Sequence, residues 1–463
     1  MFEKIVSLIN GIVWSAPLVV LLVGAGLYFS LRGRFVQIRR IGLMTRLLIR
    51  SRKKASSKKG VSSFEAFCIA LAGRVGTGNI VGVATAIALG GPGAVFWMWI
   101  VAFFGASTAF VESTLAQLYK FPHSSGFRGG PFCYIEKGLG SKWMAVLFSV
   151  VTIIACGLLL PGVQSNGLSA ALYNSFGINT LFSGLVLIFL VGLVIVGGVR
   201  RIAKAASIVA PFMAVAYLLI AVIVLAINWK VIPGMLMLIV RSAFGIDPLC
   251  GGILGSTIVI GVKRGLYSNE AGQGTGAIPS ASADVDHPAE QGLVQSFSVY
   301  VDTLFICTAT ALMILSAGTY NIFDARTGEM LLANVPELGA NYVNYTQAAV
   351  SSALGGFGGA LISIALSFFV FTTIMADYFY SESSIAYLCS MRNNASPRLE
   401  KTLIRLLQLF VLGSVLFGAV KEADTVWMMG DIGMGLMAWV NVAAIILLSP
   451  KAFAALKEYE GLK

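Results

Sequence analysis

The sequence predicts an all-α polytopic membrane protein, and three observations support this fold class. Of the 463 residues, 57% are hydrophobic and only 12% are charged, and the mean hydropathy is +0.84. A soluble domain has about 25% charged residues. Eleven apolar segments are each long enough to cross a bilayer core of about 30 Å. The basic residues gather in alternate loops between these segments.

The eleven predicted transmembrane helices begin with an N-terminal span that lacks the small-residue cleavage site of a signal peptide. They cover residues 10–31, 64–89, 93–118, 143–170, 179–199, 205–228, 247–281, 290–317, 347–389, 403–420 and 425–448. Strict alternation across the membrane places 25 of the 33 Lys and Arg residues on one side, 5 on the other and 3 within spans. Because basic loops remain in the cytoplasm, we expect the N-terminus outside and the C-terminus inside.

Two of the predicted spans are interrupted by glycines. The first break is the run Ala72–Asn79 and the second is Gly265–Gly276. Each glycine costs roughly 1 kcal/mol of helix propensity relative to alanine, and backbone freed within hydrocarbon must find other partners. Two interrupted spans in corresponding positions indicate the binding site of a secondary transporter.

The topology also predicts an inverted repeat. The first broken span runs outward, the second runs inward, and four spans follow each of them. The chain is therefore expected to form a 5+5 inverted-repeat core preceded by one extra N-terminal helix. We expect four parts: residues 1–63 with the extra helix and a basic cytoplasmic loop, 64–230 and 231–448 with the two five-helix repeats, and 449–463 as a short cytoplasmic tail.

The first break has the residues for an amino acid and a cation. A half-helix that begins near Gly78 or Asn79 would direct free N–H groups and the positive end of its dipole at a carboxylate. Thr77 adds a hydroxyl, and carbonyl groups around Ala72 and Val75 could coordinate a small cation. The alternative is that the glycines only allow close helix packing.

The second break brings polar and ionisable groups into a span. Such groups are costly within a membrane and are usually functional. Glu270 is the sharpest candidate: it could receive a substrate ammonium, take part in ion coupling, or neutralise one of the basic residues Arg74, Lys263 and Arg264. The other candidates here are Tyr267, Asn269, Gly272, Gln273, Gly274 and Thr275.

Three residues of the span 347–389 form a second candidate half-site. Thr372 and Thr373 lie three and four positions after Phe369, so all three share one helical face. A carbonyl with two hydroxyls is a hard-oxygen set that suits Na⁺, although these hydroxyls can also bond back to their own helix. Gln164, after the helix-breaking Pro161-Gly162, could reach the substrate. We interpret Glu112, Asp302 and Glu382 as span-end or interhelical polar contacts.

Other function classes lack support in the sequence. The six cysteines contain no CxxC pair, and only His123 and His287 accompany them, so we expect packing residues and neither a cysteine-based metal framework nor a disulfide framework. No nucleophile with a base and no P-loop is present, so neither an enzyme nor a bound cofactor is expected. The net charge of +12 is explained by loops beside apolar spans, so no nucleic acid is expected as a partner. No obligate protein partner is indicated.

Two stretches carry a family resemblance. The run from Gly73 to Trp99, GRVGTGNIVGVATAIALGGPGAVFWMW, and the run YSNEAGQG from Tyr267, with DHPAEQGLV following from Asp286, resemble the alanine/glycine:cation symporter family (AGCS) of the amino acid–polyamine–organocation superfamily. The resemblance implies a LeuT-like fold and sodium-driven uptake of alanine or glycine across a prokaryotic inner membrane. It also implies a carboxylate-binding turn at Gly76, Thr77, Gly78 and Asn79, and a sodium site at Ala72, Val75, Phe369, Thr372 and Thr373.

Arg74 departs from the pattern of amino acid-binding sodium symporters of this fold, so its role stays open. Three alternatives to sodium symport compete. A proton-coupled carrier of the same fold would use Glu270. A channel would need a continuous polar stripe along several spans, and a membrane-embedded enzyme would need a catalytic pair in the cavity. The sequence does not separate alanine from glycine or from another small amino acid, and it does not fix the coupling stoichiometry.

Overall fold

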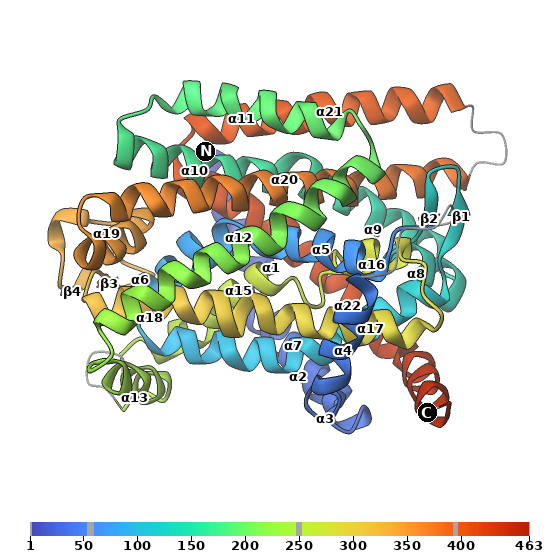
Figure 1. Ribbon diagram of the computed structural model, residues 1–463, viewed down its shortest axis with the longest axis horizontal. Coiled ribbons are helices and arrows are strands. Elements are labelled where there is room, and N and C mark those ends of the chain that lie inside the picture. Colours follow the sequence, from blue (N-terminus) through green and yellow to red (C-terminus); the bar gives the residue numbers. More distant parts are fainter. Residues whose placement is uncertain (1, 53–59, 247–251, 392–396, 463) are drawn as a thin grey trace.

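The computed structural model describes residues 2–52, 60–246, 252–391 and 397–462. Most of the basic stretch at 50–59 and the first residues of the predicted span 247–281 lie outside these ranges. Most of the long helices run lengthwise between two ends of the molecule (Figure 1). At one end lie α13, α19, β3 and β4, and at the other lie β1, β2, α8 and the C-terminus. The loops assigned by sequence to opposite sides of the membrane thus gather at opposite ends.

The first half of the chain contains the extra helices and the first broken span. Its elements are α1 (Phe2–Val13), α2 (Ala16–Arg32), α3 (Val36–Arg39), α4 (Ile41–Arg52), α5 (Ser63–Arg74), η1 (Gly78–Gly82), α6 (Val83–Gly90), α7 (Gly93–Leu118), β1 (Phe121–His123), β2 (Gly126–Arg128), α8 (Pro131–Leu139), α9 (Lys142–Ile154), η2 (Ala155–Leu159), α10 (Leu160–Phe176), α11 (Thr180–Ile195) and α12 (Val199–Ile227).

The second half contains the second broken span and ends in a long helix. Its elements are α13 (Ile232–Ala243), α15 (Leu254–Asn269), α16 (Ala277–Ser282), α17 (Pro288–Val299), η3 (Tyr300–Cys307), α18 (Thr308–Ala317), β3 (Asn321–Phe323), β4 (Met330–Ala333), η4 (Pro336–Leu338), α19 (Tyr342–Leu354), α20 (Phe357–Ser390), α21 (Pro397–Val420) and α22 (Ala423–Gly461). The short strands form two antiparallel hairpins, β1 with β2 and β3 with β4.

Within the described ranges, eight helical runs are long and apolar enough to cross a membrane, and a ninth is the pair α5 and η1–α6, which bends by 50°. Two of the eleven predicted spans fall below that length. The span 179–199 is the 16-residue helix α11, and the span 247–281 is divided into α15 and α16. The predicted span 347–389 is longer than one crossing needs, and the structure divides it at Gly355, which has a φ of 70° and separates α19 from α20.

Local sequence explains where the broken helices begin and bend. Ser62 and Glu65 form a reciprocal capping box that starts α5. Two further membrane runs contain π-helical turns, η2 before α10 and η3 between α17 and α18. Such turns are rare and frequently occur at functional sites. Both adjoin residues described below: η2 precedes Gln164 on the same run, and η3 contains Asp302.

Candidate functional site

The first break is organised by hydrogen bonds from its own backbone. Val75 has an extended conformation (φ −82°, ψ 90°), and the N–H of Gly76 donates to Asn79 Oδ1 at 2.9 Å. The next N–H, that of Thr77, donates to Gln164 Oε1 at 3.0 Å, and the Thr77 hydroxyl lies 3.0 Å from the same oxygen. One carboxamide oxygen from α10 therefore accepts from two donors of the turn, as an oxygen of a carboxylate would.

Four oxygens meet beside this turn. The hydroxyl of Thr373 lies 2.9 Å from Ala72 O, 3.2 Å from Val75 O and 2.9 Å from Phe369 O. A hydroxyl has a single proton to donate, so carbonyl lone pairs remain directed at this point. The expected half-sites of α5 and α20 therefore come together around Thr373.

Thr372 turns to a different neighbour. Its hydroxyl lies 3.0 Å from the carbonyl oxygens of both Phe368 and Phe369 and 3.3 Å from Met213 Sδ on α12. The two adjacent hydroxyls of α20 thus contact different helices: Thr372 contacts α12 and Thr373 contacts the end of α5. Thr373 is the one that faces the first break.

Gly76 joins the four-oxygen cluster to the Thr77–Gln164 pair. A Cβ atom at this position would lie 2.7 Å from Thr373 Oγ1 and 2.8 Å from Gln164 Oε1. Contacts this short require a shift of the neighbouring atoms. A cation at the oxygens and a carboxylate at the Thr77 donors would therefore be direct neighbours across Gly76.

Asn79 connects the first break to the second broken helix. Its Nδ2 donates to Asp302 Oδ1 at 2.6 Å and to Ser268 Oγ at 3.1 Å. Asp302 Oδ2 accepts from Ser268 and from Thr303, both at 2.7 Å. Asp302 is therefore an interhelical polar contact, as the sequence suggested. It holds the Asn79 side chain, whose Oδ1 accepts from Gly76 N–H.

The second break is a tight turn between α15 and α16. Glu270 adopts a left-handed conformation (φ 55°), and Gly272 and Gly274 also have positive φ values of 97° and 87°. The hydroxyl of Thr275 donates to Glu270 Oε2 at 2.8 Å, and Gln273 Nε2 donates to Leu266 O at 2.9 Å. The expected residues at 270–275 form one compact unit.

Two residues outside this turn fix it in place. Glu112 of α7 accepts from Gly272 N at 3.3 Å, and Asn441 Nδ2 of α22 donates to Glu112 Oε2 at 3.0 Å and to Gly272 O at 2.9 Å. The sequence suggested Glu112 as an interhelical contact and missed Asn441. An amide within the apolar run 432–448 was the available signal.

The basic residues of α15 have a different partner from the one considered. Lys263 Nζ and Arg264 Nη2 each lie 2.6 Å from Asp431 Oδ2 on α22. Asp431, and not Glu270, is therefore the carboxylate that neutralises Lys263 and Arg264. The Tyr267 ring stacks on Trp427 with 5.3 Å between centroids. The same ring covers the first break, since a Cβ at Gly78 would lie 2.9 Å from Tyr267 Cδ1.

A cavity of about 1020 Å³ leads toward the first break. Its lining includes Val81 and Gly167, each about one helical turn from Thr77 and Gln164 respectively. The other lining residues come from α1, α6, α10, α11, α15, α19, α21 and α22 and from the segments between them: Asn10, Thr85, Leu89, Asn166, Ala170, Thr180, Ile260, Lys263, Arg264, Ala325, Leu338, 340–343, Ala419, Val420, Lys421, Ala423, Asp424, Trp427, Met428 and Asp431.

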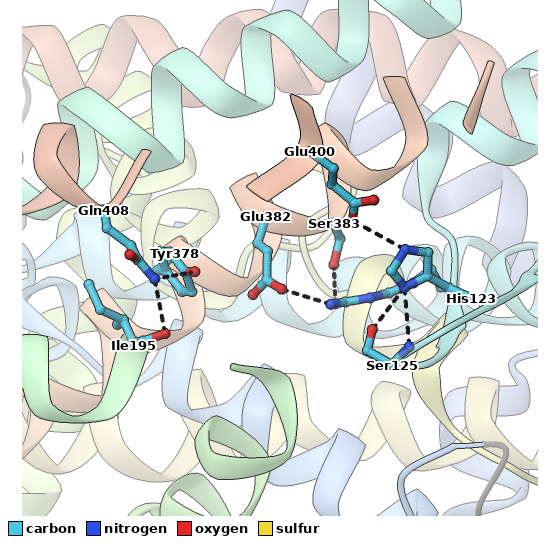
Figure 2. Close-up of polar contacts among 9 residues, drawn as sticks. His123, Ser125, Ile195, Tyr378, Glu382, Ser383, Glu400 and Gln408 are labelled. Atoms are coloured by element: carbon cyan, nitrogen blue, oxygen red, sulfur yellow. Dashed lines mark hydrogen bonds and ion pairs between the residues drawn. The ribbon is translucent and has the colours of Figure 1, made fainter. Parts of the chain in front are cut away.

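Polar contacts tie elements together at the opposite end. Arg128 of β2 pairs with Glu382 Oε1 at 3.0 Å and donates to Ser383 Oγ at 2.9 Å. His123 Nε2 lies 3.2 Å from Glu400 Oε1. The two side chains face one another in Figure 2. These contacts join the β1–β2 hairpin to the end of α20 and the start of α21, so the partner of Glu382 lies on a strand and not on another helix.

Backbone hydrogen bonds tie further segments together at this end of the molecule. Val61 N donates to Ser282 O at 3.0 Å, and Asp284 N donates to Val61 O at 2.9 Å. The nearby amine of Lys120 donates to Ala283 O at 2.8 Å. Burial lowers the pKa of Lys120 to about 8, although Asp284 opposes this shift. The segment after α16 is therefore tied to the segment before α5.

Comparison with known proteins agrees with this architecture. A family model described as the sodium:alanine symporter family matches residues 1–463. The chain belongs to this family. Among its relatives, the protein YrbD of Bacillus subtilis is 51% identical over 99% of this chain and 92% of its own length. The sodium/proton-dependent alanine carrier protein of Bacillus sp. PS3 is 47% identical over 88% of this chain and 89% of its own length.

The fold of this sodium:alanine symporter family member also occurs in solved structures. MhsT in complex with L-phenylalanine matches with a TM-score of 0.58 at 14% identity, over 86% of this chain and 98% of MhsT. The protein is thus an integral membrane transporter with a LeuT-like fold. The contacts at the two breaks bring together most of the residues that the sequence singled out, Asp302 and Glu112 included, and add Ser268 and Asn441.

Proposed function

We propose that the protein is a secondary active transporter that couples Na⁺ entry to the uptake of a small neutral amino acid, alanine or glycine, by alternating access. The observation that carries the proposal is the cluster of four oxygens around Thr373. Only Gly76 separates Val75, whose carbonyl belongs to this cluster, from the donors of Thr77. Membership of the sodium:alanine symporter family supports it.

The sodium ion would bind to hard oxygen ligands only. Ala72 O, Val75 O, Phe369 O and Thr373 Oγ1 supply four, already gathered from two helices that are about 300 residues apart in sequence. Thr372 would reach the ion only after its side chain rotates away from Met213. No resident cofactor is part of the proposal, and Na⁺ serves as the coupling ion.

The amino acid would bind with its carboxylate at the first break. Its oxygens would take the donors of Thr77 that Gln164 Oε1 occupies, beside Gly76, Gly78 and Asn79. Its ammonium would face acceptors of the second break, where Glu270 Oε2 and Gln273 Oε1 are buried. The remaining residues proposed to surround it are Gln164, Tyr267, Asn269, Gly272, Gly274 and Thr275. Because Tyr267 covers Gly78, little room remains for a long side chain.

The membrane arrangement completes the proposal. We propose eleven transmembrane helices in the inner membrane of a prokaryote, with the N-terminus outside and the C-terminus inside. The extra helix and basic loop occupy 1–63, the repeats 64–230 and 231–448, and the tail 449–463. The cavity lined by Trp427 and Asp431 then faces outward, and the Arg128–Glu382 contacts close the cytoplasmic side.

A proton-coupled symporter of the same fold is the second candidate. The observation that favours it is Glu270, a carboxyl that is 5% exposed and accepts a hydrogen bond from Thr275. Such a group could carry a proton with the substrate. The 47% identical relative is named for both sodium and proton dependence.

A counterflow experiment tests the substrate. Proteoliposomes preloaded with unlabelled alanine, glycine, glutamine or lysine are diluted into labelled alanine with Na⁺ or choline outside. We expect exchange with alanine and glycine in Na⁺ and none with lysine. Equal exchange with lysine would refute the small neutral substrate, and exchange that persists in choline would remove the sodium requirement.

A further inference from the structure

Arg74 begins between the two carbonyls of the sodium half-site and extends to the second break. It is the last residue of α5, it lies between Ala72 and Val75 in sequence, and it is 1% exposed. Its Nε donates to Asn269 O at 2.7 Å. Asn269 is the last residue of α15, so the guanidinium caps the negative end of that half-helix.

The same guanidinium lies against the other side of the second break. A Cβ at Gly276, immediately before α16, would lie 2.6 Å from Arg74 Nη2 and 3.6 Å from Glu112 Oε1. Through Nη1, Arg74 donates to Gln295 Oε1 at 3.2 Å and to Ser298 Oγ, both on α17. One side chain therefore contacts the residues that flank the second turn on both sides.

The chemistry of arginine suits this link. Its planar fork forms several hydrogen bonds in fixed directions and it keeps its charge when buried. Among the described residues, the hydrogen-bond acceptors of Arg74 are the neutral oxygens of Asn269, Gln295 and Ser298. A buried charge held in this way is sensitive to small displacements of its acceptors. A displacement of either break therefore moves Arg74 or its acceptors and alters the hydrogen bonds at the other break.

We propose that Arg74 is a positioning residue that couples the sodium half-site to the amino acid site; this inference rests on the proposed function above. A cation that draws Ala72 O and Val75 O inward displaces the end of α5. The Arg74 side chain passes that displacement to Asn269 and Gly276, which hold the turn with Glu270 and Gln273. The same link acts in reverse when the amino acid binds first, because coupling between two ligands is reciprocal.

The test measures the coupling itself. The full-length protein in nanodiscs is titrated with labelled alanine at zero and at saturating Na⁺, and the ratio of the two dissociation constants is the coupling factor. Such factors typically amount to about 5- to 150-fold. We expect Arg74→Gln to bring the factor close to one. Arg74→Lys keeps the charge without the fork, and we expect it to lose most of the coupling.

A second variant decides the question if the Arg74 variants do not fold. Ser298→Ala combined with Gln295→Leu retains Arg74 and removes its two side-chain acceptors on α17, and we expect a coupling factor reduced by at least about fivefold. Ser296→Ala is the matched control on the same helix, because the buried Ser296 hydroxyl has no partner among the described residues. We expect it to leave the factor unchanged.

The outcomes separate the two levels of inference. A wild-type factor near one overturns the proposed sodium symport and the coupling role with it. A wild-type factor of fivefold or more that survives in the folded Arg74 variants, or in the double variant, overturns only the role of Arg74. A loss of thermal stability alone, with the coupling factor retained, would identify Arg74 as merely structural.

Discussion

Thr373→Ala removes the side-chain oxygen among the four that meet at the first break. The three carbonyl oxygens of Ala72, Val75 and Phe369 remain, but the proposed sodium ion would lose one direct ligand. A hydrogen bond or similar polar contact to a charged group contributes roughly 1.5–3 kcal/mol. At 1.4 kcal/mol for each factor of ten, the half-saturating Na⁺ concentration should rise by about 10- to 150-fold.

The assay is alanine counterflow in proteoliposomes as a function of Na⁺ concentration, at saturating alanine. Thr373→Ser keeps the hydroxyl and should stay close to wild type. Thr372→Ala is the matched control, because the Thr372 hydroxyl lies beside Met213 Sδ. Wild-type sodium dependence in Thr373→Ala, or an equal loss in Thr372→Ala, would refute this account of the half-site.

Three further substitutions test separate parts of the structure. Gly76→Ala places a Cβ within 2.8 Å of the Thr373 and Gln164 oxygens and should abolish uptake. Gly82→Ala, whose added Cβ has its nearest neighbour at 3.9 Å, should retain uptake. Equal uptake by the two variants would contradict the close approach at Gly76. Asp431→Asn leaves the buried Arg264 and the partly exposed Lys263 without their carboxylate and should lower the thermal midpoint, because breaking a buried pair costs about 3–5 kcal/mol; an unchanged midpoint would contradict that pairing. Arg128→Glu should reduce uptake, and Glu382→Arg added to it should restore part of the loss; failure of the exchange to rescue would argue against this ion pair as a closure.

The sequence predicted the parts of the fold that depend on local properties. Apolar length identified most spans, and the glycines at 76, 78, 272 and 274 marked both breaks. Of these, Gly272 and Gly274 have positive φ values. The break within the segment 347–389 could not be located by hydropathy, because hydropathy does not detect a turn made by a glycine. Gly355 has a φ of 70° between two helices that are both apolar.

Long-range partners could not be predicted from one sequence. Asp431 and Lys263 lie 168 positions apart, and Asn79 and Asp302 lie 223 apart. Each residue looked polar by itself, but the pairs depend on how the helices pack. The same limit applies to the adjacent hydroxyls of α20. Thr372 and Thr373 are equivalent by spacing from Phe369, and the packing of α12 against α20 distinguishes them.

In the proposed function, sodium drives accumulation of a small neutral amino acid through the site at the first break. The most direct measurement is uptake of labelled alanine into proteoliposomes that already contain alanine at the external concentration. We predict net accumulation under an inward Na⁺ gradient at equal pH, and no accumulation under an inward proton gradient without Na⁺. Accumulation driven by the proton gradient alone would contradict the account and transfer the coupling role to a carboxyl such as Glu270.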